Sequence, residues 1–182
     1  MITFDRERPQ DFAEIEALHG AAFGPKRFEK SSNLLRQDNP PIARFSAVMR
    51  AEDHVAATVR FTPVHVAGSF FGTRQNALLL GPLAVHPMMQ GAGLGTELMK
   101  HALAAVDSAG YERILLVGDI SYYYRFGFEH VMPKLISMPD GRDAARLLTR
   151  CEDTSEPLPT VGTVQAGWST VFDTQPHLMP AI

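Results

Sequence analysis

One segment, residues 83–96, constrains the fold of this chain more than any other. It begins as an apolar strand, Leu83-Ala84-Val85, and after a short turn it places Gly91, Gly93 and Gly95 at alternate positions where a helix begins. This order collects free backbone N–H groups at a helix N-terminus, which carries a positive partial charge of about half a unit. Glycine allows close backbone approach and positive φ. The segment therefore predicts a site for a phosphate or diphosphate.

The spacing of the glycines separates three kinds of phosphate loop. A Walker loop requires Gly-Lys-Ser/Thr, but Gly95 is followed by Thr96 and Glu97. The dinucleotide pattern G-x-G-x-x-G fits Gly91 and Gly93, but its third glycine would fall at Thr96. An NAD-dependent oxidoreductase is therefore a weak alternative, supported otherwise only by Asp119 after the next expected strand.

The third pattern, Gln-x-x-Gly-x-Gly, is met by Gln90, Gly93 and Gly95. Here the chain resembles the GCN5-related N-acetyltransferases, which hold the diphosphate of coenzyme A with a Gln/Arg-x-x-Gly-x-Gly/Ala loop. A second segment, Tyr123-Tyr-Arg-Phe-Gly-Phe128, matches the family's Tyr-x-x-x-Gly-Phe. One helix and one strand are expected between the two motifs, as the resemblance requires. The detailed resemblance covers about residues 78–130.

The resemblance implies an acyltransferase that moves an acetyl group from acetyl-CoA to a primary amine by direct attack in a ternary complex. The residues it implies for cofactor binding are Leu83, Ala84, Val85, Gln90, Gly91, Ala92, Gly93, Leu94, Gly95 and Thr96. It implies Tyr123 as the general acid, because a phenol with a pKa of about 10 can protonate a departing thiolate. Tyr122 or Tyr124 could face the site instead.

The sequence does not identify the general base. His65, His86, Asp119 and Glu29 are candidates, and each also has a structural interpretation or no motif around it. His65 alternates with apolar residues on an expected strand, His86 precedes a proline, and Asp119 is placed to cap a short helix. None of the seven histidines has metal-ligand spacing, so no metal is expected.

Composition narrows the class of protein further. The chain has 182 residues, of which 45% are hydrophobic, and this favours a single domain over residues 1–182. A net charge of −3 without runs of like charge makes nucleic acid and anionic membranes poor partners. A single cysteine excludes an internal disulfide. The charged N-terminus and the absence of long apolar runs lead us to expect a cytoplasmic protein without membrane spans.

Hydrophobic periodicity predicts the order of elements along the chain. Strands are expected at residues 2–5, 43–49, 55–67, 75–86, 114–117, 129–138 and 163–170, helices at 9–23, 28–36, 94–109 and 120–126, and a strand or helix at 144–150. Pro82 lies inside the strand at 75–86 and cannot donate a ladder hydrogen bond. A bulge or splay is therefore expected there, with the backbone groups of residues 83–85 left unpaired.

Antiparallel strands that lead into one strand–helix–strand unit favour an α+β fold over a doubly wound one. The resemblance specifies a single-domain, mostly antiparallel mixed sheet with a central splayed parallel strand pair, flanking helices, and pantetheine in the splay. It divides the chain into core motifs at 78–130 and C-terminal strands and an extension at 131–182.

The acceptor and the assembly are the least constrained features. The resemblance places acceptor specificity in residues 20–40 and 135–182, where no motif is recognised, so the acceptor is an unidentified small-molecule or peptide amine. Pairing of an edge strand with a second copy would give a homodimer. The alternative function is a non-catalytic acyl-CoA-binding or sensing module on the same fold.

Overall fold

A computed structural model describes residues 2–70, 72–151 and 155–168. Within them lies a nine-stranded sheet of order β1-β2-β3-β4-β5-β8-β6, and β9 pairs with both β3 and β7. The strands are β1 (Ile2–Arg6), β2 (Ala47–Ala51), β3 (His54–Gly68), β4 (Arg74–Val85), β5 (Arg113–Val117), β6 (Glu129–His130), β7 (Ile136–Ser137), β8 (Leu147–Cys151) and β9 (Gly162–Ala166). The α-helices are α1 (Phe12–Phe23), α2 (Ser31–Leu34), α3 (Leu94–Ser108) and α4 (Ile120–Tyr123), and the 3₁₀ helices are η1 (Pro9–Asp11), η2 (Pro25–Glu29), η3 (Pro87–Met89), η4 (Tyr124–Phe126) and η5 (Ala144–Arg146).

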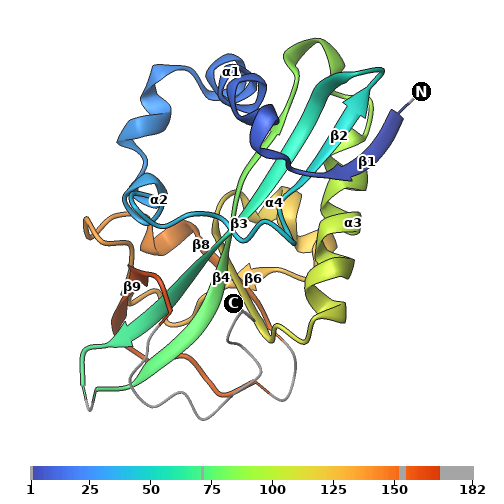
Figure 1. Cartoon of the computed structure of the whole chain (residues 1–182). Helices are drawn as coiled ribbons and strands as arrows, with labels where there is room; N and C mark the ends of the chain where they lie inside the picture. The colour runs from blue at the N-terminus through green and yellow to red at the C-terminus, as the bar shows by residue number, and fades with distance from the viewer. Residues whose placement is uncertain (1, 71, 152–154, 169–182) are drawn as a thin grey trace.

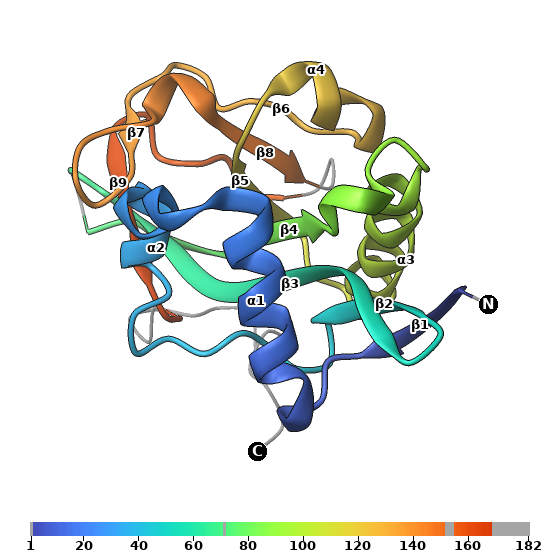
Figure 2. The ribbon, with the colours of Figure 1, turned by 90° about the horizontal axis from the view of Figure 1, so that it is seen from above.

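Helices α1 and α3 cover opposite faces of the sheet (Figures 1 and 2). Alternation along β2 explains why both faces are apolar: Ala47 and Met49 join the cluster beneath α3, and Val48 joins the cluster beneath α1. Ile15 and Leu18 are the fully buried apolar side chains of α1. The sheet is therefore packed between two helical layers, which is the α+β arrangement expected from the sequence.

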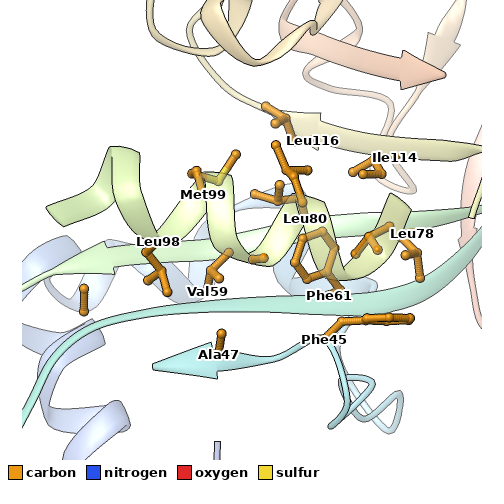
Figure 3. Close-up of a cluster of buried hydrophobic side chains, with 14 of the residues drawn as sticks. Phe45, Ala47, Val59, Phe61, Leu78, Leu80, Leu98, Met99, Ile114 and Leu116 are labelled. Atoms are coloured by element: carbon orange, nitrogen blue, oxygen red, sulfur yellow. The ribbon is translucent and has the colours of Figure 1, made fainter. Parts of the chain in front are cut away.

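The core beneath α3 is the larger one, and Figure 3 shows how its side chains meet. Leu98 of α3 points toward Val59 of β3, Met99 and Phe61 belong to the same cluster, and all four side chains are completely buried. Leu78 and Leu80 of β4 and Ile114 and Leu116 of β5 continue the same layer. This packing fixes the start of α3 relative to the ends of β4 and β5.

The central strand pair is parallel and short. Only Leu78 and Leu79 of β4 pair with β5, opposite Ile114 and Leu115, and beyond them the two strands diverge (Figure 2). On its other side β4 stays paired with β3, but the register shifts between Val59 and Phe61, opposite residues 81–82. The structure thus confirms the mixed sheet, the bulge at Pro82 and the splayed parallel pair.

Several predicted boundaries are wrong. Residues 43–46 form a turn rather than a strand, because the amides of Phe45 and Ser46 donate to the carbonyl of Ile42 at 3.0 and 3.1 Å. The single strand expected at 129–138 is two short strands, β6 and β7, with Pro133 between them. The helix expected at 28–36 is split into η2 and α2.

At the C-terminal end, the undecided segment 144–150 is a turn of 3₁₀ helix followed by β8. The last strand among the described residues is β9, which ends at Ala166, and residues 169–170 of the expected strand lie outside the described residues. Among the described helices, none has both the length and the apolar character needed to cross a membrane.

Candidate active site

The loop before α3 has the backbone geometry that anion-binding turns use. Gly91 and Gly93 have φ of 82° and 80°, in the left-handed region that favours glycine, and Gly93 is the N-cap of α3. Of the first helical amides, Thr96 N–H already donates to the Gly93 carbonyl at 3.0 Å. The backbone N–H groups of residues 91–95 have no acceptor among the described residues. These five donors, exposed or half-exposed except at Leu94, are those an anion would meet.

Gly95 has a different role, in packing. A Cβ atom there would lie 3.2 Å from Tyr122 Oη and 3.3 Å from Val85 Cγ2. The absence of a side chain therefore lets α3 begin close to the end of β4 and to α4. Gln90 ties the loop to the same strand, because its side-chain amide donates to the Val85 carbonyl at 3.3 Å.

The end of β4 presents an open backbone edge. His86 N–H donates to Ala56 O of β3 at 2.8 Å, and backbone groups of successive residues point to opposite sides of a strand. Leu83 and Val85 therefore turn their N–H and C=O groups away from β3, toward the side where β5 has diverged. Ala84 differs from the expectation: its backbone faces β3, and its side chain is buried beneath α1.

Tyr123 stands at the end of α4, across the splay from β4. Its ring occupies space that a side chain at position 118 would fill, because a Cβ atom on Gly118 would lie 2.4 Å from Tyr123 Cε2. The ring packs edge-on against Tyr122 and Phe128. No described residue forms a hydrogen bond to its hydroxyl, and burial raises its pKa to about 12.

The structure places the three neighbouring tyrosines, Tyr122, Tyr123 and Tyr124, in different surroundings. Tyr123 lines a cavity at the splay, and neither Tyr122 nor Tyr124 does. Tyr122 lies beside Gly95, with Arg125 above its ring, and Tyr124 is 75% exposed. The geometry thus favours Tyr123 over its neighbours as the group that meets a ligand there.

The cavity has a volume of about 420 Å³ and opens between the splayed strands and the N-terminal helices. Its floor comes from residues 80–83 of β4 and residues 117–119 at the end of β5. Its outer wall comes from α1, η2 and α2, with Arg60 of β3 and Arg146 of η5. Residues 90–96 do not line it, so the glycine loop and the cavity are distinct features.

Of the four base candidates from the sequence, only Asp119 reaches the cavity. Asp119 caps α4 by accepting from Ser121 N–H at 2.9 Å, and this bond lowers the pKa of its carboxyl. His65 is held between the Gly167 carbonyl and the Gln165 side chain, and His86 accepts from Met88 N–H. Glu29 does not line the cavity.

Several cavity residues were not predicted from the sequence, among them Glu16, His19 and Arg36. Glu16 receives hydrogen bonds from Arg27 at 3.1 Å and Arg60 at 3.5 Å. Burial, with Arg60 nearby, lowers the pKa of His19 to about 4, so this ring is neutral near pH 7. Glu16 and His19 lie three residues apart on α1, so they share one side of the helix, and His19 belongs to its buried face.

No group of three or more His, Cys, Asp or Glu side chains in the described part of the chain is placed to hold a metal ion.

Comparison with known proteins identifies the class to which this site belongs. Residues 12–128 match the model of the acetyltransferase (GNAT) family. The match covers well over half of the chain and includes the loop, the splay and Tyr123. The chain belongs to the GNAT family and is an N-acetyltransferase.

Two sequence relatives and two solved structures are also similar to this chain. The chain is 30% identical over 133 residues to YjhQ of Escherichia coli K12, covering 70% of each chain, and 32% identical over 123 residues to YhbS, covering 68% and 71%. Both relatives are named as uncharacterized N-acetyltransferases. A Brucella melitensis GNAT acetyltransferase in complex with acetyl-CoA superposes with a TM-score of 0.65 at 28% identity, over 95% of this chain and 99% of that one. YhbS in complex with CoA superposes with a TM-score of 0.72 at 25% identity, over 91% and 89%.

Proposed function

We propose that this chain transfers an acetyl group from acetyl-CoA to a primary amine by direct attack within a ternary complex. The observation that carries the proposal is the arrangement of three parts: five unengaged amides at the start of α3, an open β4 edge, and the free hydroxyl of Tyr123. Two relatives of the same fold were solved with acetyl-CoA or CoA.

The three parts suit the three sections of the cofactor. The diphosphate would accept hydrogen bonds from the amides of residues 91–95, with Gln90 and Thr96 on either side. The pantetheine would lie along the open edge and bond to the backbone of Leu83 and Val85, as the family resemblance implies. The thioester would then reach the cavity, where the acceptor enters from the opposite side.

Chemistry at the thioester needs oxyanion stabilisation and proton transfer. The neutral amine attacks the carbonyl carbon, and a backbone N–H of the β4 edge donates to the oxygen that becomes negatively charged. The intermediate collapses by breaking the C–S bond, and Tyr123 donates its proton to the thiolate. The amine proton leaves through the cavity, where Glu16 and Asp119 supply carboxylates.

The test is the release of free thiol from acetyl-CoA by the purified protein, with and without a panel of primary amines. The proposal predicts release that depends on added amine, and a mass increase of one acetyl group on the acceptor. Binding of acetyl-CoA without turnover of any amine would instead support the binding-module alternative. Equal release with and without amine would indicate a hydrolase.

A further inference from the structure

The cavity wall carries more positive charge than its carboxylates can balance. It holds five cationic side chains and two carboxylates: Arg27, Lys30, Arg36, Arg60 and Arg146 against Glu16 and Asp119. His19 adds no charge near neutral pH, because burial lowers its pKa. Such a wall attracts an anionic group on whatever enters the cavity.

Two of the cations are already neutralised. Arg27 pairs with Glu16 at 3.1 Å, and Arg60 pairs with Glu7 at 2.6 Å and with Glu16 at 3.5 Å. The other three, Lys30, Arg36 and Arg146, have no carboxylate within 4.0 Å among residues 2–70, 72–151 and 155–168. Lys30 lies over the ring of Phe23 at 4.6 Å. Among the described residues, the unpaired positive charge of the cavity therefore belongs to Lys30, Arg36 and Arg146.

Arg36 is the most deeply placed of these three. Its Nε donates to the Gly81 carbonyl at 3.1 Å and its Nη1 to Ser32 Oγ at 3.1 Å, so both partners are neutral. Burial, together with Arg60, lowers the pKa of this guanidinium to about 10, which leaves it charged near pH 7. A desolvated guanidinium bound only to neutral groups is stabilised strongly by a carboxylate, whose two oxygens match its donor geometry.

Coenzyme A is not the anion for which this charge is placed. Its diphosphate is assigned to the loop at 90–96, and none of these residues lines the cavity. Arg36 instead approaches β4 at Gly81, two residues before Leu83, where the strand edge opens toward Tyr123. A group bound at Arg36 therefore lies a short distance from the reacting end. The volume, about 420 Å³, suits a small molecule.

We propose that the acceptor is a small primary amine that also carries a carboxylate, and that Arg36 and Lys30 bind this carboxylate while the amine faces the β4 edge and Tyr123. This inference rests on the proposed function and specifies the substrate class of the same site. Arg36 would act as a specificity-determining residue, without a part in proton transfer.

The experiment compares amines that differ in the carboxylate alone. Acetylation rates are measured at saturating acetyl-CoA for lysine and cadaverine, phenylalanine and phenethylamine, and γ-aminobutyrate and n-propylamine. The proposal predicts a kcat/KM at least tenfold higher for at least one carboxylate-bearing member, expressed mainly in KM. Equal or higher rates for the amines that lack the carboxylate overturn the substrate class but leave acetyl transfer intact. Turnover of no amine, in this panel or a wider one, counts against the proposed function itself.

Variants test the assigned residues. Arg36→Gln is expected to raise the KM for the preferred carboxylate amine at least tenfold, with the KM for acetyl-CoA unchanged. Lys30→Gln, at the exposed rim, tests the same idea without disturbing β4 and should raise that KM about three- to tenfold. Lys26→Gln is the matched control, because Lys26 lies on η2, four residues before Lys30, but does not line the cavity. If Lys30→Gln and Arg36→Gln both behave like Lys26→Gln, the assignment is overturned.

Discussion

At the scale of single residues, the proposed chemistry depends on a tyrosine that is kept protonated. Tyr123 is partly buried, its hydroxyl has no partner among the described residues, and its pKa is raised to about 12 by burial. A general acid must hold its proton until the leaving group departs, and this environment ensures that it does. Gly118 makes the arrangement sterically possible.

Replacement of Tyr123 by phenylalanine keeps the ring packing and removes the proton. We expect kcat to fall about 100-fold or more, with little change in acetyl-CoA affinity. In the wild type the raised pKa keeps the acid protonated, so ionisation of Tyr123 should not lower kcat below pH 10. Tyr124→Phe is the control, since that side chain is exposed and outside the cavity. Equal rates for the two variants would remove Tyr123 from the mechanism.

His19 makes folding stability depend on pH. Burial lowers its pKa to about 4, whereas in the unfolded chain the imidazole titrates near 6.5. Between these values the unfolded state binds the proton and the folded state does not, so stability falls as pH falls from 6.5 to 4. The loss amounts to about 3 kcal/mol at most.

Urea denaturation of His19→Gln at pH 7, 5.5 and 4.5 measures this effect. The variant should lose less stability than the wild type across the interval, and the difference should grow toward the lowest pH. His54→Gln serves as control, because that side chain is exposed. Parallel pH curves for wild type and His19→Gln would show that His19 carries no such linkage.

At the scale of elements, the glycine loop was the part most open to prediction. Alternating glycines between a strand and a helix leave few backbone solutions, and the structure adopts positive φ at Gly91 and Gly93. The bulge at Pro82 could be predicted equally well, because proline has no backbone N–H to donate within a sheet. The sequence did not predict which backbone groups of residues 83–85 stay unpaired, because that depends on the pairing register between β4 and β3.

Gly93→Ala and Gly110→Ala form a matched pair that isolates the role of the loop. Both glycines have positive φ, 80° and 73°, with open space where a Cβ would be, so both variants should lose about 1–2 kcal/mol of stability. Gly110 follows the C-terminal end of α3, far along the helix from the loop. Only Gly93→Ala should weaken acetyl-CoA binding in calorimetry, by about tenfold or more. Equal affinities would separate the loop from cofactor binding.

At the scale of the whole molecule, the sheet brings together residues that are distant in the chain. Arg36 meets Gly81, and Glu16 meets Arg60, across 45 and 44 positions. The fold class followed from local motifs and the order of elements, but these contacts have no local signal. The N-terminal helices that form the outer wall of the cavity carry charges whose pairing only the tertiary structure defines. The sequence therefore predicted the glycine loop more fully than the cavity.

The central claim is that cofactor and acceptor use separate parts of one site: the start of α3 and the basic cavity. A crystal structure of the protein with CoA tests this most directly. We predict the diphosphate against the amides of residues 91–95, pantetheine along Leu83 and Val85, and a cavity with Arg36 and Lys30 unoccupied by the cofactor. A diphosphate bound to Arg36 and Lys30 would contradict the account, because the positive charge would then serve the cofactor and not the acceptor.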